Sequence, residues 1–173
     1  LKTQVSQMVE EDKKMTQVMI DKVFSFGELG FQEFETSKYL SNILEENGFE
    51  LQYNISDIPT SWLAKWSNGS GGPVIALGSD FDGVPSTSQY PGVAYEKPVV
   101  EGAPGHGEGH NIGLPIVITA ALSIKKVMIE NNITYIFGGG RNEIIKSNSN
   151  FAHDMFYGSV SYTHLTLPTS RSV

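Results

Sequence analysis

Two short segments of this chain combine side chains that bind metals with glycines that let the backbone pack closely. The first segment, SDFDGVP, carries Asp80 and Asp82. The second, GHGEGHN, carries Glu108 and His110. In an extended chain, residues i and i+2 point to the same side, so the two side chains of each pair can converge on one small volume. Carboxylate oxygens and an imidazole nitrogen are ligands of a catalytic zinc, and they also suit manganese or cobalt. The pattern therefore predicts part of a metallohydrolase site.

Each pair also has a structural interpretation. Aspartates at the end of a strand commonly bond their own backbone in an Asx-turn, which is the alternative for Asp80 and Asp82. For Glu108 and His110 the alternative is a helix start with a structural histidine. We expect His106 to order the loop rather than to bind metal. The glycines at 138–140 lack a following Lys-Ser/Thr, so they do not predict a phosphate-binding loop.

Three helices are predicted from apolar periodicity. A stripe spaced at i, i+3, i+4 and i+8 favours a helix over residues 9–26, and a second follows from residue 35 to a stop at Asn47 and Gly48. A third helix is predicted over residues 114–130, with Pro115 tolerated in its first turn. Because it is apolar on almost every side, we expect it to be buried.

Strand signals lie between these helices. Residues 49–53 and 62–66 alternate in polarity, and the glycines of residues 68–72 predict a hairpin turn after the second of these strands. Residues 74–78 form a continuous apolar run, typical of a strand buried on both faces, and residues 135–137 predict another strand. This order favours a three-layer α/β/α sandwich with a mixed sheet. Asp80 follows the end of a strand, where sites gather in such folds.

The composition is that of an ordinary globular domain. The 173 residues are 39% hydrophobic and 18% charged, and the net charge of -7 argues against nucleic-acid binding. The chain has no cysteine, so a thiolate cannot act as ligand or nucleophile. We expect no membrane span, because no apolar run reaches about 18 residues. The chain starts at Leu1, so we expect the true N-terminus to be missing; a cytoplasmic location is favoured, with export as the alternative.

Three stretches together resemble the zinc aminoacylase and glutamate-carboxypeptidase-type amidohydrolases. They are FSFGELGFQEFE from residue 24, IALGSDFD from residue 75 and EGAPGHGEGHN from residue 101. The resemblance covers residues 15–137, about the first third of such an enzyme. It implies that residues 1–159 are the amino-terminal part of a catalytic domain. It also implies a parent enzyme that is a homodimer, joined through a domain this chain lacks.

The resemblance also implies roles for single residues. His110 matches a ligand of the catalytic metal. Glu108 stands where many relatives carry a cysteine ligand, and Asp80 stands where other branches carry a metal-binding histidine. An oxygen ligand at Glu108 shifts the metal preference from soft to harder metals. Asp82 matches the acidic residue that orients a ligand.

A further acidic pair is expected after the next strand. Glu143 matches the first member of this pair, which is the general base. Ile144 occupies the place of the second member, which is a ligand in the family. An isoleucine cannot bind a metal, so Ile144 lowers the metal affinity that the resemblance implies.

The resemblance implies a metal-dependent amidohydrolase that cleaves an N-acyl or N-aroyl amino acid, or a short peptide, with metal-activated water. Zinc is the expected metal. The alternative, favoured by Ile144, is a non-catalytic binding or scaffold module that keeps the fold. We expect this chain, as an incomplete catalytic domain, to be inactive by itself.

The last residues have a different origin in this interpretation. Residues 160–169, VSYTHLTLPT, resemble the translation of a transposase-type adapter used in sequencing libraries. We therefore expect residues 160–173 to be a fused tail rather than a domain.

Overall fold

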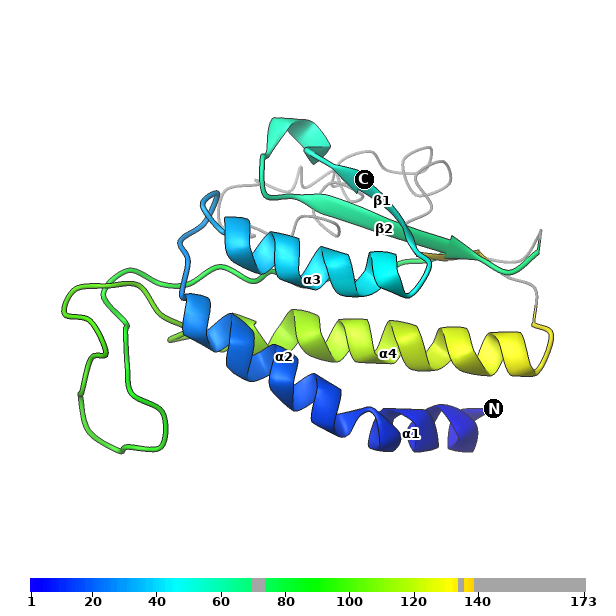
Figure 1. Cartoon of the computed structure of the whole chain (residues 1–173), viewed down its shortest axis with the longest axis horizontal. Helices are drawn as coiled ribbons and strands as arrows, with labels where there is room; N and C mark the ends of the chain where they lie inside the picture. Colours follow the sequence, from blue (N-terminus) through cyan, green and yellow to red (C-terminus); the bar gives the residue numbers. More distant parts are fainter. Residues whose placement is uncertain (70–73, 134–135, 139–173) are drawn as a thin grey trace, which may run out of the picture.

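The computed structural model describes residues 1–69, 74–133 and 136–138, and the following account concerns these residues. The elements follow in the order α1 (Lys2–Glu11), α2 (Lys13–Phe26), α3 (Phe34–Glu46), β1 (Glu50–Tyr53), a 3-10 turn (Ile55–Asp57), β2 (Trp62–Ser67), β3 (Val74–Ile75), α4 (His110–Glu130) and β4 (Ile136–Gly138), as Figure 1 shows. The predicted adapter-derived tail, residues 160–173, lies outside the described residues.

The strands form one mixed sheet in the order β1-β2-β4-β3. The β1–β2 and β2–β4 pairs are antiparallel, whereas β3 and β4 are parallel. The predicted mixed sheet is therefore confirmed. The predicted hairpin between β2 and β3 is wrong, because β4 lies between them: Lys65 pairs with Gly138 on one side, and Val74 pairs with Ile136 on the other.

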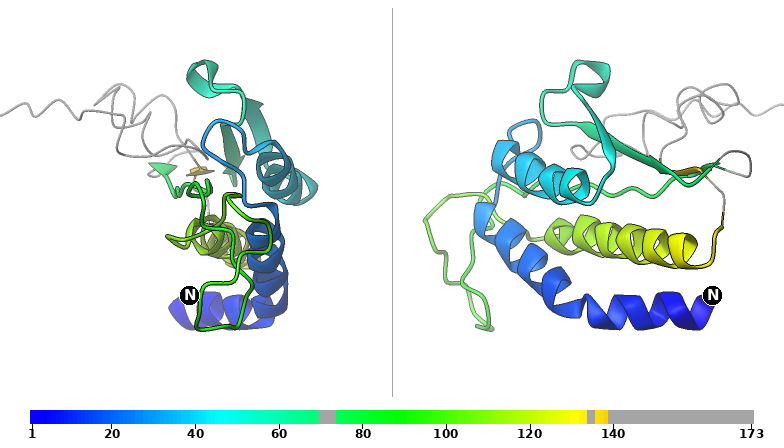
Figure 2. Two further views of the ribbon diagram at one scale, coloured as in Figure 1. Left: turned by 90° about the vertical axis from the view of Figure 1, so that its left-hand side faces the viewer. Right: turned by 45° about the vertical axis from the view of Figure 1, so that its right-hand side comes forward.

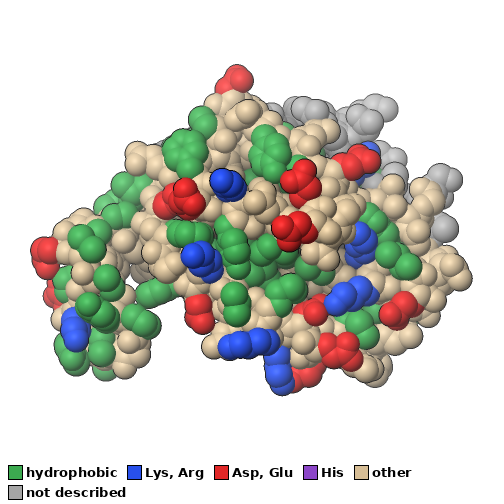
Figure 3. Space-filling model, viewed as in Figure 1, with side chains coloured by type: hydrophobic (Ala, Val, Ile, Leu, Met, Phe, Trp, Pro, Cys, Tyr) green, Lys and Arg blue, Asp and Glu red, His purple; other side chains and the backbone are tan. Residues whose placement is uncertain are grey.

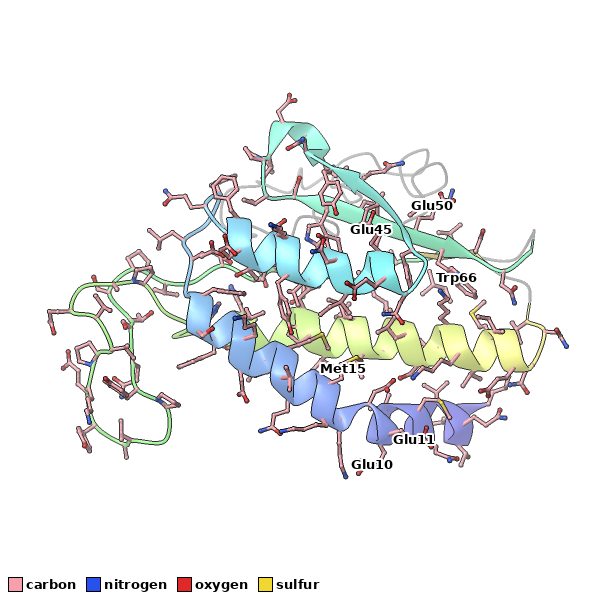
Figure 4. The ribbon with its side chains drawn as sticks, viewed as in Figure 1. Glu10, Glu11, Met15, Glu45, Glu50 and Trp66 are labelled. Carbon is pink, nitrogen blue, oxygen red and sulfur yellow. The ribbon has the colours of Figure 1, made fainter. Side chains whose placement is uncertain are left out.

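Helices α3 and α4 lie on the same side of the sheet, and α1 and α2 pack against α4 (Figure 2). Met15 of α2 lies between α2 and α4 and packs against the hydrophobic core described below (Figure 4). The α/β class is confirmed, and the described residues hold the sheet with helices on one of its faces. The core joins α2, α3, β2 and α4, a residue just before β1 and one after β3, through Met19, Val23, Leu40, Leu44, Phe49, Trp62, Phe81, Leu114, Ile118, Ala121 and Leu122.

The first predicted helix, residues 9–26, covers α2 and only the last three residues of α1, and the two helices meet at Asp12. The backbone of Asp12 has φ −86° and ψ 3°, which breaks the helical geometry. The carbonyl oxygen of Asp12 accepts a hydrogen bond from the Thr16 amide. Its carboxylate pairs with Lys126 of α4 at 2.8 Å. The bend thus turns α1 along α4, and apolar periodicity alone did not predict it.

The strand predicted over residues 74–78 is shorter and more exposed than expected. Only Val74 and Ile75 form a strand, and the side chains of Ile75 and Leu77 are 44% and 36% exposed. The prediction of burial on both faces is therefore wrong. The physical reason is position, because among the described residues β3 is the edge strand of the sheet and pairs with β4 alone.

Helix α4 starts four residues earlier than predicted, so Pro115 lies in its second turn. It is buried along one side, while Ile112, Ile116 and Ile129 are about half exposed. By length and composition alone, this helix could cross a membrane, a test that core helices of folded proteins also pass. Half of its most apolar stretch is buried inside the molecule.

Residues 86–104 form a protruding arm between the two predicted site segments (Figure 1). The amide of Tyr90 donates to the Lys97 carbonyl at 2.8 Å, and the amide of Ser88 donates to the Ala103 carbonyl at 3.0 Å. Apolar side chains cover much of its surface (Figure 3), and Tyr95 is 64% exposed. The arm thus holds its own shape through backbone bonds between its two sides.

Candidate metal centre

The two site segments meet through the backbone at a glycine junction, made of Glu28, Gly83, Val84 and Gly105. The amide of Gly83 donates to the carbonyl of Glu28 at 2.6 Å. Val84 and Gly105 exchange two backbone hydrogen bonds, of 2.7 and 3.1 Å. A Cβ on Gly83 would lie 3.0 Å from the carbonyl oxygens of Glu28 and Gly105. A side chain at Gly83 would therefore push the segments apart.

Gly105 is under a stronger constraint than Gly83. A Cβ there would lie 2.5 Å from the carbonyl oxygen of Thr87, an approach that real side chains do not make. The hydroxyl of Thr87 donates to the carbonyls of Val84 and Gly105, each at 2.8 Å. The junction is therefore fixed by backbone contacts that need glycine.

The first turn of α4 brings the histidine to the strand end. Gly109 precedes the helix with φ +93°, a conformation that favours glycine, and His110 is the first helical residue. One turn later, a Cβ on Gly113 would lie 2.3 Å from the Ser79 hydroxyl. Close packing at Gly113 thus lets the residues after β3 run beside the start of α4.

Asp82 fixes the ring of His110. The Nδ1 atom of His110 lies 2.9 Å from the Asp82 carboxylate oxygen Oδ1 and 3.2 Å from the Asp82 carbonyl oxygen. Both oxygens are acceptors, so Nδ1 carries a proton and donates it. In the neutral ring, the other nitrogen, Nε2, is then an acceptor.

Two carboxylates face this second nitrogen. Nε2 of His110 lies 3.5 Å from Oδ1 of Asp80 and 3.3 Å from Oε2 of Glu108. The lone pair of Nε2 repels each of these two carboxylates unless a cation lies beside it, either a proton on Nε2 or a metal ion. Carboxylates and imidazole are a donor set for a divalent metal, so the residues fit one.

The cluster is partly shielded from solvent. The side chains of Asp80, Asp82 and His110 are 16%, 18% and 25% exposed, and their ligand-type atoms lie within 4.8 Å of one another. Glu108 is 66% exposed. Although these three side chains form the tightest group, Asp82 already accepts the proton of Nδ1. Asp80 and Glu108 are therefore the carboxylates that could share a metal ion with Nε2 of His110.

His106 lies beside this cluster but points elsewhere. Its Nε2 atom lies 3.0 Å from the Val23 carbonyl oxygen in α2, and its ring contacts Phe24. Burial is the largest effect on His106 and lowers its pKa below the ordinary histidine value. This placement agrees with the expected loop-ordering role.

Of the predicted site residues, the structure brings together Asp80, Asp82, Glu108 and His110. The predicted base Glu143 and its neighbour Ile144 lie outside the described residues. The roles of these side chains in binding and catalysis stay predictions.

Glu28 is a supporting residue that the sequence analysis did not single out. Its carboxylate accepts hydrogen bonds from the amides of Glu35 and Thr36, at 3.0 and 2.9 Å, and from the Thr36 hydroxyl at 2.8 Å. These groups belong to the first turn of α3, whose amides have no partner within the helix. Glu28 therefore joins the start of α3 to the glycine junction, and its place in the FGELG motif is the only signal of this in the sequence.

Comparison with known proteins confirms the resemblance to amidohydrolases. The chain is 33% identical over 122 residues to one of the subunits of p-aminobenzoyl-glutamate hydrolase from Escherichia coli strain K12, an alignment that covers 70% of this chain and 25% of that protein. It is 30% identical over 129 residues to an uncharacterised hydrolase of Staphylococcus haemolyticus, covering 69% of this chain and 32% of that one. No protein-family profile matches the chain.

A solved structure shows the same fold. It is a protein from methicillin-resistant Staphylococcus aureus that is assigned to the aminohydrolases, with a TM-score of 0.66 and 17% sequence identity. The alignment covers 80% of this chain and 34% of that one. The chain thus spans between a quarter and a third of the length of these relatives.

Proposed function

We propose that this chain carries part of the catalytic centre of a metal-dependent amidohydrolase. The substrate class is an N-acyl or N-aroyl amino acid, or a short peptide, which is cleaved at its amide bond. One observation carries the proposal: Asp82 holds Nδ1 of His110, and two carboxylates face Nε2 of the same ring. The similarity to hydrolases, one of them named for an aminobenzoyl-glutamate amide, supports the choice of reaction.

His110, Asp80 and Glu108 would hold the metal through Nε2 and the two carboxylates. A bound divalent metal polarises a carbonyl group and makes water a nucleophile near neutral pH. Because two of the three ligands are carboxylates, zinc, manganese and cobalt all suit the set. We propose zinc as the metal in the cell.

Each residue of the centre has a separate task in this proposal. Asp82 keeps the proton of His110 on Nδ1, so that the lone pair of Nε2 faces the ligand position. Glu143 is proposed as the base that takes a proton from the attacking water and passes it to the leaving amine, on the strength of its sequence match alone. We also propose that the enzyme works as a multi-subunit assembly, since the Escherichia coli relative is named as one subunit of its enzyme.

Isothermal titration of the 173-residue chain with zinc and with manganese tests the metal centre. We expect saturable binding that is lost in His110→Ala and strongly weakened in Glu108→Ala. An unchanged stoichiometry in both variants would contradict the proposal. A chain that binds no metal would favour the alternative, a binding or scaffold module.

Catalysis is a separate measurement. Because the chain spans only about a quarter to a third of the length of its relatives, we expect it to show no appreciable hydrolysis of N-acyl amino acids by itself. A release of free amine that depends on added zinc would overturn this expectation.

A further inference from the structure

His106 makes a contact that reaches from the metal segment to a different element. Its Nε2 atom lies 3.0 Å from the carbonyl oxygen of Val23, in the last turn of α2. A carbonyl can only accept, so Nε2 donates in either protonation state of the ring. The same carbonyl also accepts a hydrogen bond from the amide of Gly27, at 3.5 Å. His106 therefore supplies the shorter of the two bonds.

The segment that carries His106, residues 105–107, packs against Thr87 as well as against α2. A Cβ on Gly105 would meet the Thr87 carbonyl at 2.5 Å, and one on Gly107 would meet the Thr87 side chain at 3.2 Å. The segment is thus held between the base of the arm and α2. The proposed ligands Glu108 and His110 follow this segment directly. Gly109, with φ +93°, lies between them.

Without a fixed segment, these two side chains would not share one geometry. A Cβ at Gly109 would meet nothing within 4 Å, so side-chain packing does not hold the backbone at that residue. Asp82 and His110 also act electrostatically on the His106 ring, in addition to its contact with Val23.

We propose that His106 is a positioning residue of the metal centre: by bonding the Val23 carbonyl, it ties the loop that bears Glu108 and His110 to the end of α2. This inference rests on the proposed metal site. Its contribution is to affinity and ligand geometry, and His106 does not itself contact the metal.

The test compares three variants of the full chain. His106→Phe keeps an aromatic ring beside Phe24 and removes the donor. His106→Gln keeps an amide donor near the position of Nε2. Thr16→Val is the matched control, because it removes the 2.7 Å hydroxyl contact between Thr16 of α2 and Thr119 of α4. This contact also involves α2, but it lies more than two turns into α4, away from the proposed ligands. Zinc affinity is measured by competition with a chromophoric chelator, and ligand geometry by the visible spectrum of the cobalt-loaded chain.

We expect His106→Phe to weaken zinc binding by about tenfold or more, as loss of a residue that orients a ligand commonly does, and to change the cobalt spectrum. His106→Gln should restore both. Thr16→Val should lower stability in urea and leave affinity and spectrum unchanged. If His106→Phe does not fold, His106→Met, which also lacks the donor, replaces it with the same expectations.

Two results would overturn the inference, and they differ in their consequences. Equal zinc affinity in the unmodified chain and His106→Phe would remove the positioning role and leave the metal centre intact. A chain that binds no zinc at all would remove the metal centre and the positioning role together.

Discussion

At the scale of single residues, the contact between Asp82 and His110 decides which ring nitrogen faces the carboxylates. We predict that Asp82→Ala weakens zinc binding by about 10- to 100-fold, because the ring loses the partner that fixes its proton and its orientation. Asp82→Asn, whose amide oxygen can still accept the proton, should lose less. Calorimetric titration measures both, and Asp21→Asn, an exposed change on α2, is the control. Equal affinity in Asp82→Ala and the unmodified chain would contradict an orienting role.

Gly105 gives a prediction about stability at the same scale. Gly105→Ala should lower the free energy of unfolding by about 1–3 kcal/mol, because its Cβ meets a backbone oxygen that cannot turn aside. Gly107→Ala is the matched control, since its Cβ meets the Thr87 side chain at 3.2 Å rather than a backbone oxygen at 2.5 Å. Urea unfolding compares the two. A larger loss in Gly107→Ala than in Gly105→Ala would show that the junction is not where the close contact matters.

The spacing of the site residues was the part that the sequence predicted best. Residues at i and i+2 beside glycine placed Asp80, Asp82, Glu108 and His110 in one prediction, and the structure brings their side chains together. The sequence could not predict which ring nitrogen Asp82 contacts, because that depends on how the start of α4 packs against the residues that follow β3. The bond of His106 to Val23 was missed for the same reason, since the two residues are far apart in the chain.

At the scale of elements, the start of α3 depends on a side chain outside the helix. Glu28 accepts two backbone amides of its first turn, the task of a helix cap. We predict that Glu28→Ala lowers the free energy of unfolding by about 0.5–2 kcal/mol. Urea unfolding measures the loss, with the exposed change Gln32→Ala as control. If both variants unfold alike, Glu28 does not act as the cap.

Local apolar patterns predicted the helices and strands, but they did not predict which strands pair in the sheet. The apolar stripes placed α2, α3 and most of α4, because each depends on neighbours within two turns. The order of the strands depends on β4, which enters between β2 and β3 from the far end of the described chain. A glycine-rich turn after β2 looked like a hairpin since nothing in the two strands themselves reveals a third strand between them.

Lys125 illustrates how distant contacts decide the packing of α4 on the sheet. Its Nζ lies 5.2 Å from the ring centre of Phe49 and 5.3 Å from that of Trp66, which Figure 4 places near the end of β2. It also donates to the carbonyl of Asn47, which ends α3. Burial lowers the pKa of Lys125, whereas the two rings favour its charge. Such a contact joins three elements and has no sequence signature.

At the scale of the whole molecule, apolar side chains are exposed on β3, just after it and on α4. Ile75 and Leu77 are 44% and 36% exposed, and Ile112 and Ile116 are 44% and 52% exposed. An apolar edge strand promotes association between chains. We predict that the sedimentation coefficient rises with concentration, and that Ile75→Lys reduces this rise. Val9→Lys on α1 adds the same charge to a side chain that is 39% exposed and should have no such effect. Concentration-independent sedimentation of the unmodified chain would contradict the prediction.

The bonds between Val84 and Gly105 have a consequence for how this chain can vary. They close the arm at its base, so residues 86–104 are an appendage on a fixed stem. Closing a longer loop costs little additional entropy, about 0.6 kcal/mol for each doubling of its length. The tip near Gly92, where a Cβ would touch nothing, can therefore accept insertions, grafted recognition peptides or a dye-labelled cysteine. Residues 86–104 can therefore be replaced by other sequences without changing the spacing of the residues at the base of the arm.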